Sequence, residues 1–396
     1  MAGTDFTISL NCPSTQARLG ELKLLHGTVQ TPIFLPVGTQ ATVRSLTPED
    51  LEQMHIKMIL CNAYHLYLRP GVEIVEKAGG LHKFMQWKRP ILTDSGGYQI
   101  FSLSSFHSIS EEGISFKSHI DGSQRYITPE TAVDIQEKLG ADIIMALDVC
   151  PESTAKKVHI IHAMEYTARW AQRCREAKKD NGQLLFGIIQ GGAYPELRLK
   201  STEQIVSLDF PGYAIGGLSL GESKEAMWST IDYTVPHMPA NKPRYLMGVG
   251  SPEDIVEGIS RGIDIFDCAL PTRVARNGAL FTRKGRKNLK RTLYRDNLGP
   301  VEEGCACYTC ANFTSAYLHH LFKCEELLAY RLATIHNLHF MNQLVLDIRE
   351  AVRRGEYGKF RQEFLSGYQT TDEERRIDQK LRGLETKKER ASTDFQ

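Results

Sequence analysis

Three cysteines lie within six residues, at Cys305, Cys307 and Cys310. Three thiolates and one imidazole form a closed tetrahedral shell for Zn²⁺, with no position left open for a substrate. We therefore predict one structural zinc ion per chain, against the alternative of a thiol cluster that binds no metal. The spacing alone leaves the remaining ligands open, because several other side chains follow the cluster: His319, His320, Cys324, His336 and His339.

A second group of reactive side chains follows short apolar runs: Asp94, Asp148, Gln190 and Asp267. One such acid could be a loop cap, but three carboxylates brought to one place would repel each other and lose hydration, which folding alone does not favour. Two carboxylates can carry out a retaining displacement at an anomeric carbon, one as nucleophile and the other as acid and then base. The third, with the glutamine and backbone amides, could read the edge of a base.

Glycine pairs and apolar side chains near these acids indicate a slot for a flat ring. Gly96-Gly97 and Gly216-Gly217 would let such a ring approach the backbone closely. Tyr98 and Met247 could form its two faces, although ordinary core packing explains Met247 equally well.

A basic segment runs from Arg273 to Arg291, with eight Lys or Arg residues and no Asp or Glu. Its first two arginines, Arg273 and Arg276, come directly after the run that holds Asp267. Such a segment is often only a solvated surface, but beside an acidic pocket it favours a phosphate-binding surface. The chain's net charge of +1 therefore does not exclude nucleic acid, since the positive charge is local.

Eight apolar runs, each typical of a buried parallel strand, would position these residues. They are Thr31–Gly38, Met58–His65, Pro90–Gly97, Asp142–Val149, Leu184–Gly191, Gly212–Ser219, Pro243–Gly250 and Ile263–Leu270. Helical patterns alternate with them, three of which begin Thr/Ser-Pro-Glu at Thr47, Thr128 and Ser251, and Gly140 and Gly262 mark helix ends. Eight alternations favour an α/β fold, a (β/α)8 TIM barrel with functional residues at the carboxyl ends of the strands. An open doubly wound sheet is the alternative, but no GxGxxG follows the first run.

Two stretches interrupt the alternation. Residues 98–127 are polar, with a hairpin predicted at Asp121-Gly122, and residues 271–335 hold the basic segment and the cysteines. The amphipathic stretch Leu338–Val352 would be the delayed eighth barrel helix. We thus expect barrel strands and an N-terminal extension in 1–270, a basic, zinc-binding insertion after the eighth strand in 271–335, the final helix region in 336–366, and a charged, weakly packed tail in 367–396.

Composition is that of an ordinary soluble protein: 396 residues, 41% hydrophobic and 24% charged. The N-terminal residues lack the pattern of a secretory signal, and no apolar run approaches a membrane span. Nine cysteines, five of them scattered singly, suit a reducing compartment. We expect a cytoplasmic protein with no membrane contact.

Over essentially its whole length the chain resembles the bacterial branch of the queuosine tRNA-guanine transglycosylases. The motifs that carry the resemblance, besides the cysteines with His336, are Thr93-Asp-Ser-Gly-Gly-Tyr-Gln99, Ala146-Leu-Asp-Val-Cys150, Gln190-Gly-Gly192, Gly216-Gly-Leu218, Phe266-Asp-Cys268 and Pro271-Thr-Arg-Val-Ala-Arg-Asn-Gly278. Among the histidines, the resemblance favours His336 as the fourth zinc ligand.

The resemblance implies an exchange of guanine at anticodon position 34 of tRNA for 7-aminomethyl-7-deazaguanine (preQ1), in tRNAs that carry G34 and U35. Asp267 would attack C1′ of the nucleoside to give a glycosyl-aspartate, and Asp94 would serve as acid and then base. The contacts to the base would come from Asp148, Ser95, Gln190, the amide of Gly217 and the carbonyl of Leu218, with Tyr98 and Met247 on its two faces and Asn62 at the ribose. The expected tRNA contacts are Arg273, Arg276, Lys284, Arg286 and Lys287.

The resemblance also implies a homodimer, with Phe313, Tyr317 and His320 near the zinc site in the contact. Leu220 and Cys150 stand where queuine-using relatives carry smaller or different side chains, which favours the smaller base preQ1 over queuine. A non-catalytic tRNA-binding partner of the same fold is the alternative, but it would be expected to lack the nucleophile or the zinc ligands. An archaeal relative would carry an added RNA-binding domain, and a generic glycoside hydrolase would not need the basic segment.

Overall fold

The computed structural model describes residues 5–104, 106–152 and 154–370. Its centre is an eight-stranded parallel sheet in the order β4-β14-β13-β12-β11-β10-β6-β5. A parallel bridge between Val37 and Leu60 joins the two outer strands, with a hydrogen bond from Gly38 N to Leu60 O, so the sheet closes into a barrel. The strands are β4 (Ile33–Pro36), β5 (Ile59–Cys61), β6 (Ile91–Thr93), β10 (Ile143–Met145), β11 (Leu184–Ile189), β12 (Tyr213–Ile215), β13 (Arg244–Leu246) and β14 (Ile265–Cys268).

Every one of these strands lies inside a predicted apolar run, so the predicted (β/α)8 fold is confirmed. The observed strands are shorter than the runs, because the ends of the runs leave the sheet to form the loops of the barrel. The helices around the barrel are α1 (Pro48–Gln53), α2 (Ala63–Leu68), α3 (Val72–Lys77), α4 (Leu81–Phe84), α6 (Pro129–Leu139), α7 (Lys157–Ala177), α8 (Pro195–Val206), α9 (Lys224–Thr234), η1 (Val235–His237) and α10 (Pro252–Ser260).

The predicted helix starts are confirmed. Thr47, Thr128 and Ser251 each accept a hydrogen bond from a backbone N–H of the first turn, and proline follows each of them. Gly140 and Gly262 lie at the ends of α6 and α10 with φ of +75° and +86°, the left-handed backbone that a helix end often needs.

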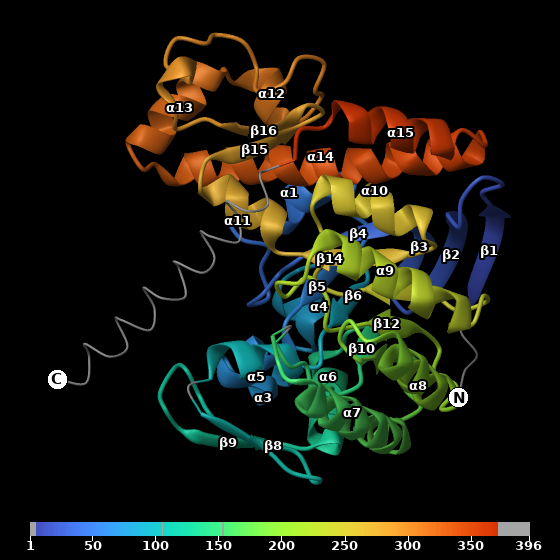
Figure 1. Cartoon of the computed structure of the whole chain (residues 1–396). Helices are drawn as coiled ribbons and strands as arrows, with labels where there is room; N and C mark the ends of the chain where they lie inside the picture. The colour runs from blue at the N-terminus through green and yellow to red at the C-terminus, as the bar shows by residue number, and fades with distance from the viewer. Residues whose placement is uncertain (1–4, 105, 153, 371–396) are drawn as a thin grey trace.

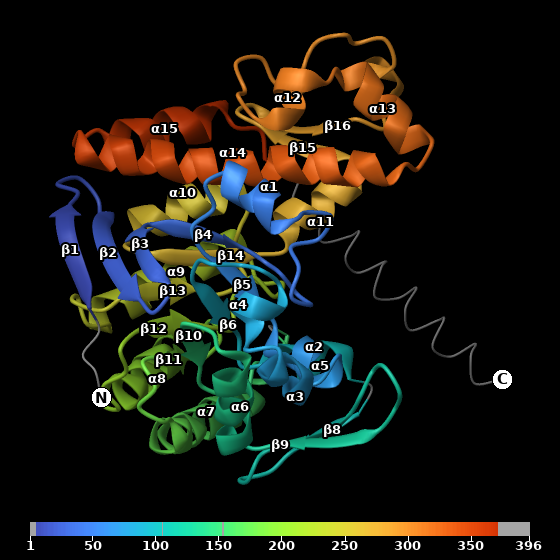
Figure 2. The same ribbon diagram turned by 180° about the vertical axis from the view of Figure 1, so that it is seen from behind.

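A three-stranded antiparallel sheet, β1 (Phe6–Asn11), β2 (Arg18–Leu24) and β3 (Gly27–Thr31), precedes the barrel and was not predicted. Phe6, Leu22 and Val29 belong to the same buried cluster as the side chains inside the barrel. The sheet therefore closes the amino-terminal end of the barrel, on the side of the molecule away from α12 and α13 (Figures 1 and 2).

Asp142 ties this sheet to the barrel floor at the start of β10. Its carboxylate, fully buried, accepts hydrogen bonds from the backbone N–H groups of His26 (2.8 Å) and Ile91 (2.8 Å). The rings of His26 and His82 stack with centroids 3.5 Å apart and contact its two oxygens. The group lies at the end of the barrel opposite to the predicted site.

The first interruption consists of α5 (Gly97–Leu103) and a small antiparallel sheet, β7 (His107–Ile109), β8 (Ile114–Lys117) and β9 (Gln124–Ile127). Strands β8 and β9 pair across the turn at Asp121-Gly122, as predicted. This sheet extends from the barrel beside α5 in both views (Figures 1 and 2).

The insertion, residues 271–335, begins in α11 (Leu270–Arg276) and continues through β15 (Ala279–Thr282), β16 (Gly285–Asn288), η2 (Thr292–Tyr294), α12 (Tyr308–Asn312) and α13 (Ser315–Lys323). The long helix α14 (Leu327–Arg353) passes under the insertion and then along the barrel, and α15 (Tyr357–Gly367) follows it (Figure 1). Helix α14 therefore begins 11 residues before the predicted Leu338. Its first turns pack in the small core of the insertion through Ala329, Leu332 and Ala333, so the apolar stripe changes partner along the helix.

The predicted tail from residue 367 falls mostly outside the described residues. Within them, Tyr368 is buried and Gln369 pairs with Gly285. No helix in the described ranges has the length and apolar character that a membrane crossing needs.

Candidate active site

The predicted polar residues gather at the carboxyl end of the barrel. Asp94 follows β6, Asp148 follows β10, Gln190 follows β11 and Asp267 lies near the end of β14. Each is at most 8% exposed. The parallel strands bring these four side chains to one end of the barrel, although up to 173 positions of sequence separate them.

Two donors hold the carboxylate of Asp267. The hydroxyl of Tyr245 donates to Oδ1 at 2.6 Å and the backbone N–H of Gly248 donates to the same oxygen at 2.8 Å. Burial raises the pKa of Asp267, and the two donors counteract that shift. Because both hydrogen bonds reach Oδ1, the carboxylate is oriented while Oδ2 carries no hydrogen bond from the described residues.

Asp94 also accepts several hydrogen bonds. Oδ1 accepts from the N–H of Ala63 at 2.9 Å, and Oδ2 accepts from the amides of Gln99 at 2.8 Å and of Asn62. Burial nevertheless raises the pKa of Asp94 to about 7, and the charge of Asp267 adds to the increase. At neutral pH Asp94 is thus protonated in a large fraction of molecules, as a group that must give and take a proton should be.

The third acid, Asp148, is held by two polar side chains. Ser95 Oγ donates to its Oδ1 at 2.9 Å and Gln190 Nε2 donates to its Oδ2 at 2.7 Å. Burial raises the pKa of Asp148. Gly97 is necessary here, because a Cβ at that position would lie 2.5 Å from the carbonyl oxygen of Asp148.

The Gly216-Gly217 pair follows β12 and packs on Gln190. A Cβ on either glycine would lie within 2.7 Å of the Gln190 amide, and Gly217 has a φ of +71°. Leu218 is buried directly after it. The loop then turns around Glu222, whose carboxylate accepts the N–H groups of Ser219, Leu220 and Gly221.

Three further predicted residues follow, or begin the helix after, strands at the same end of the barrel. Tyr98 lies in the first turn of α5 and is 46% exposed, and Met247 follows β13 and is half-buried. Asn62, predicted at the ribose, is buried and donates its amide to Asp94. The structure thus gives Asn62 a partner within the acid pair.

The first two arginines of the basic segment lie in α11, directly after the strand of Asp267. Arg273 is exposed, and Arg276 donates to the carbonyl of Thr272 at 2.9 Å. Besides burial, the charges of Arg44 and Arg273 lower the pKa of Arg276. The positive charge beside the acids therefore includes Arg44, which the sequence analysis missed because it lies far from the basic segment.

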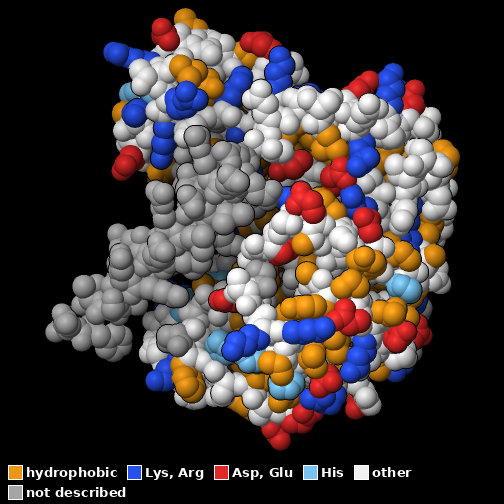
Figure 3. All heavy atoms as spheres, in the orientation of Figure 1, with side chains coloured by type: hydrophobic (Ala, Val, Ile, Leu, Met, Phe, Trp, Pro, Cys, Tyr) orange, Lys and Arg blue, Asp and Glu red, His pale blue; other side chains and the backbone are white. Residues whose placement is uncertain are grey.

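The predicted basic residues of the β15–β16 hairpin differ in how far their charged groups are engaged in contacts within the protein. Lys284 is exposed, whereas the guanidinium of Arg286 lies 5.1 Å above the ring of Phe281 and Lys287 donates to the carbonyl of Val301 at 2.6 Å. Lys and Arg side chains still gather on the face of the insertion seen in Figure 3. Lys284 has the freest charge of the three, since Arg286 and Lys287 partly serve to hold the insertion.

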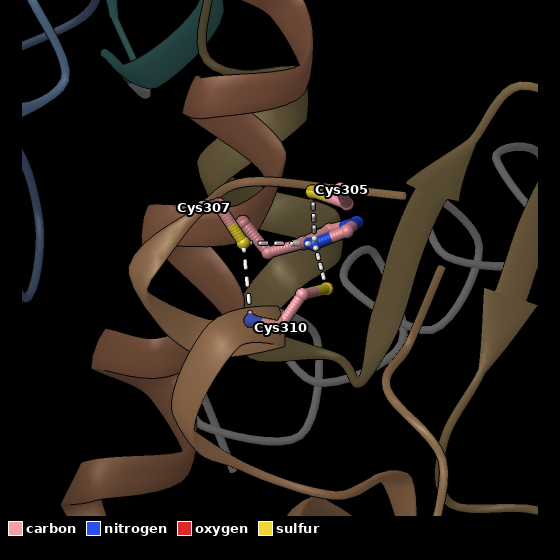
Figure 4. Close-up of side chains that lie close together, drawn as sticks. Cys305, Cys307 and Cys310 are labelled. Atoms are coloured by element: carbon pink, nitrogen blue, oxygen red, sulfur yellow. Dashed lines mark hydrogen bonds between the residues drawn. The ribbon is translucent and has the colours of Figure 1, made fainter. Parts of the chain in front are cut away.

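The side chains of Cys305, Cys307 and Cys310 lie close together, as the close-up in Figure 4 shows. All three contact His336 of α14. Cys305, Cys307 and Cys310 place Sγ at 3.9, 3.4 and 3.3 Å from Nδ1 of His336. Tetrahedral zinc with ordinary Zn–S and Zn–N bond lengths separates sulfur and nitrogen by about 3.6 Å, so this donor set fits the metal. The Nε2–H of His336 donates to the carbonyl of Phe281 at 2.7 Å, which leaves Nδ1 free to be a ligand.

The competing side chains lie elsewhere. His319 donates to the carbonyl of Leu289, and Cys324 is exposed beside His320. The group of four that could hold a metal ion is therefore Cys305, Cys307, Cys310 and His336.

Sequence analysis missed three residues that shape the pocket: Tyr245, Arg198 and Glu222. Tyr245 lies within a barrel strand and is indistinguishable from core in the sequence. Arg198 lies near the start of α8, where an arginine is usually exposed, yet its side chain is fully buried. Glu222 carried a weak signal, an acid three residues after a glycine-rich strand end.

A closed (β/α)8 barrel with a buried acid pair, a third acid bound to glutamine, and a Cys3His group that could hold a metal ion is typical of a glycosyl-transfer class of enzyme. Comparison with known proteins agrees. A family model described as queuine tRNA-ribosyltransferase matches residues 12–370. The chain belongs to this family, so the predicted family and the predicted transglycosylase (pentosyltransferase) class are both confirmed.

Similar proteins cover nearly the whole chain. A queuine tRNA-ribosyltransferase of Dehalococcoides mccartyi is 56% identical over 379 residues, which cover 96% of this chain and 97% of the relative. One from Caldanaerobacter subterraneus is 52% identical over 375 residues, 94% of this chain and 100% of the relative. One from Lysinibacillus sphaericus is 53% identical over 358 residues, 90% and 94% of the two chains.

Proposed function

We propose that this enzyme exchanges guanine at position 34 of tRNA for preQ1 in the biosynthesis of queuosine. The observation that carries the proposal is the acid pair: Asp267 is oriented by two donors, and Asp94 beside it has a pKa of about 7. Membership of the family and the name of its relatives, queuine tRNA-ribosyltransferase, support the choice of tRNA as substrate.

The reaction has two displacements at one carbon. A carboxylate oxygen of Asp267 attacks C1′ of the nucleoside, the bond from C1′ to N9 breaks, and guanine leaves with the proton of Asp94. The incoming base then gives its N9 proton to the Asp94 carboxylate, and N9 displaces Asp267 from C1′. One glycosidic bond replaces another, so no ATP is consumed.

The base would lie against the Asp148 group. Guanine presents N–H donors on the edge that carries N1 and the 2-amino group, which suit the carboxylate of Asp148, and a carbonyl oxygen, which suits an N–H donor. The proposed partners are Asp148, Ser95, Gln190, the N–H of Gly217 and the carbonyl of Leu218. Tyr98 and Met247 would cover its faces, and Asn62, held by Asp94, would lie next to the ribose.

We propose preQ1 rather than queuine as the natural incoming base. Leu220 follows the Gly-Gly-Leu-Ser turn after β12, and Cys150 is buried after β10. Queuine adds a bulky cyclopentenediol to the aminomethyl arm. Overpacking a well-packed site costs on the order of 1–3 kcal/mol, roughly ten- to a hundredfold in binding.

Zinc would be bound by the Cys3His group and would serve folding, since all four positions of a tetrahedral ion are taken. The tRNA would contact Arg273 and Arg276 beside the acids and the hairpin that carries Lys284, Arg286 and Lys287. The tRNAs would be those with G34 and U35.

We further propose a homodimer through the face of the insertion near the zinc group. Phe313 and Tyr317 stack there with ring centroids 5.5 Å apart, Tyr317 is 38% exposed, and His320 is exposed on the same helix. A cytoplasmic location suits the nine cysteines, all of which are unpaired.

Incorporation of radiolabelled guanine tests the function. The protein should transfer label into unmodified tRNA that carries G34, and preQ1 should displace it. Absence of transfer, with intact protein and zinc, would favour the non-catalytic partner subunit. Release of guanine that leaves an abasic ribose in the tRNA, without base incorporation, would favour a glycoside hydrolase.

A further inference from the structure

Arg198 is a fully buried arginine whose donors all reach main-chain carbonyls. From α8, its Nε donates to Gly192 O at 2.7 Å, Nη1 to Ile189 O at 3.0 Å and Nη2 to Gly216 O at 2.9 Å. No carboxylate of the described residues lies within ion-pair distance of it. Burial lowers its pKa to about 10, so it is charged at neutral pH. The charge of Glu222 favours the charged guanidinium without a direct ion pair. A buried charge with no directly bonded counter-charge is costly, and here its hydrogen bonds join the ends of β11 and β12.

The third contact fixes a particular peptide plane. Gly216 O and the N–H of Gly217 belong to one planar trans peptide, so they point in opposite directions. Arg198 holds the oxygen, and the N–H is thereby turned the other way. Without such an anchor a peptide between two glycines could rotate at little cost, since neither residue has a Cβ to prevent it.

The N–H of Gly217 faces a poor acceptor. It is directed at the Cys150 sulfur, whose pKa burial raises to about 12, so the group is a neutral thiol. A thiol sulfur accepts hydrogen bonds weakly. A carbonyl oxygen of a ligand would accept a stronger hydrogen bond from the same N–H.

The same guanidinium also fixes the neighbouring strand end. Ile189 O accepts both Nη1 of Arg198 and the N–H of Gly216 at 3.0 Å. The next N–H, that of Gln190, donates to Ser201 Oγ at 3.0 Å. Gln190 in turn donates to Asp148. Arg198 therefore holds both strand ends that face Asp148.

We propose that Arg198 is a positioning residue that aims the N–H of Gly217 at the 6-oxo group of the bound purine. Its charge on the carbonyl also polarises the peptide and makes the N–H a stronger donor. The inference rests on the proposed function, because it takes guanine or preQ1 as the occupant of the pocket.

Steady-state kinetics of Arg198→Met on the zinc-loaded enzyme test the proposal. The KM for guanine should rise roughly tenfold, the loss expected for one hydrogen bond, while the KM for tRNA stays within about twofold. The sulfur of 6-thioguanine accepts hydrogen bonds more weakly, so the inhibition constant of this base should change less. The preference of the enzyme for guanine over 6-thioguanine should therefore be smaller in Arg198→Met than in wild type. Arg198→Lys, which keeps the charge but has a single donor nitrogen, should lie between wild type and Arg198→Met.

Arg244→Met is the matched control. Arg244 is also buried, and its guanidinium donates to the carbonyls of Gly262 and Met238, away from the acids. It should lower thermal stability and leave the KM for guanine unchanged. Equal weakening of guanine and 6-thioguanine by Arg198→Met, or an unchanged KM for guanine, would overturn the proposal. If Arg198→Met does not fold, the comparison of guanine with 6-thioguanine is made with Arg198→Lys, and its result decides between the same outcomes. An inactive wild type would instead refute the proposed function.

Discussion

Asp94→Asn should stabilise the protein at neutral pH while it removes the proposed acid of the reaction. Burial raises the pKa of Asp94 from 3.8 to about 7, so the folded state binds its proton more tightly than the unfolded chain does. The unfavourable contribution is absent below the unfolded value near 3.8, grows as pH rises, and is complete above about 7. Asparagine cannot ionise and escapes this cost.

The magnitude follows from the same pKa. At about 1.4 kcal/mol per pKa unit, the raised pKa of Asp94 lowers the free energy of unfolding by about 4 kcal/mol at pH 7 and by about 2 kcal/mol at pH 5. Asparagine has one acceptor oxygen where aspartate has two. The variant therefore loses either the hydrogen bond from Ala63 or the pair of hydrogen bonds from Asn62 and Gln99. That loss is about 1–2 kcal/mol at either pH. The net gain should be about 2 kcal/mol at pH 7 and near zero at pH 5.

Chemical denaturation of wild type and variant at the two pH values, with zinc bound to both, measures the difference. The contribution of zinc is common to both proteins and cancels. Asp264→Asn is the matched control, because Asp264 is buried in an ion pair with Arg18 and its loss should destabilise the protein at pH 7. A change in unfolding free energy for Asp94→Asn that is the same at both pH values would refute the assignment of a raised pKa. The rate of base exchange should fall by roughly 10²–10⁴.

Four further changes have defined outcomes. Asp267→Asn should abolish the denaturant-resistant tRNA adduct in a gel assay and leave tRNA binding intact, whereas a persistent adduct would make Asp94 the nucleophile. Cys307→Ala should lose zinc by elemental analysis and lower both the melting temperature and the affinity for tRNA; a metal-free yet equally stable wild type would contradict this. Arg273→Ala should weaken tRNA binding and reduce its salt dependence by about one phosphate contact, and an unchanged slope would leave Arg273 a solvated charge. Leu220→Gly should raise the use of queuine relative to preQ1, unless wild type already uses both equally.

The barrel could be predicted because its signals are local. Each buried strand forms a short apolar run, and each helix start places a hydroxyl before proline, as at Thr128 and Ser251. The start of α14 could not be predicted in this way, because its first turns pack on the insertion and its later turns pack on the barrel. A single amphipathic period from Leu338 onward describes only the second environment. The sheet β1–β3 was missed because exposed and buried residues are mixed along its strands and its apolar pattern is weak.

The sequence predicts which acids lie at the site and at which strand ends, but it does not predict their pKa values or their orientation. Asp94 and Asp267 each follow or end an apolar run, so the fold class alone brings them together. What raises the pKa of Asp94 is burial under neighbouring elements, and what orients Asp267 is Tyr245 from another strand. Tyr245 lies 22 positions before Asp267 and is indistinguishable from ordinary core in the sequence.

The zinc group and the barrel mouth are connected through one short segment, which makes a structural metal relevant to substrate binding. His336 donates to the carbonyl of Phe281, and the adjacent Asn337 accepts the N–H of Phe281 and donates to the carbonyl of Pro271. Pro271 begins the turn of helix that presents Arg273 beside Asp267. A metal bound by His336 would therefore also hold in place the first basic residues after Asp267, the proposed nucleophile. Loss of zinc should then weaken the binding of tRNA more than the binding of the free base, because the proposed base contacts come from strands on the other side of the barrel.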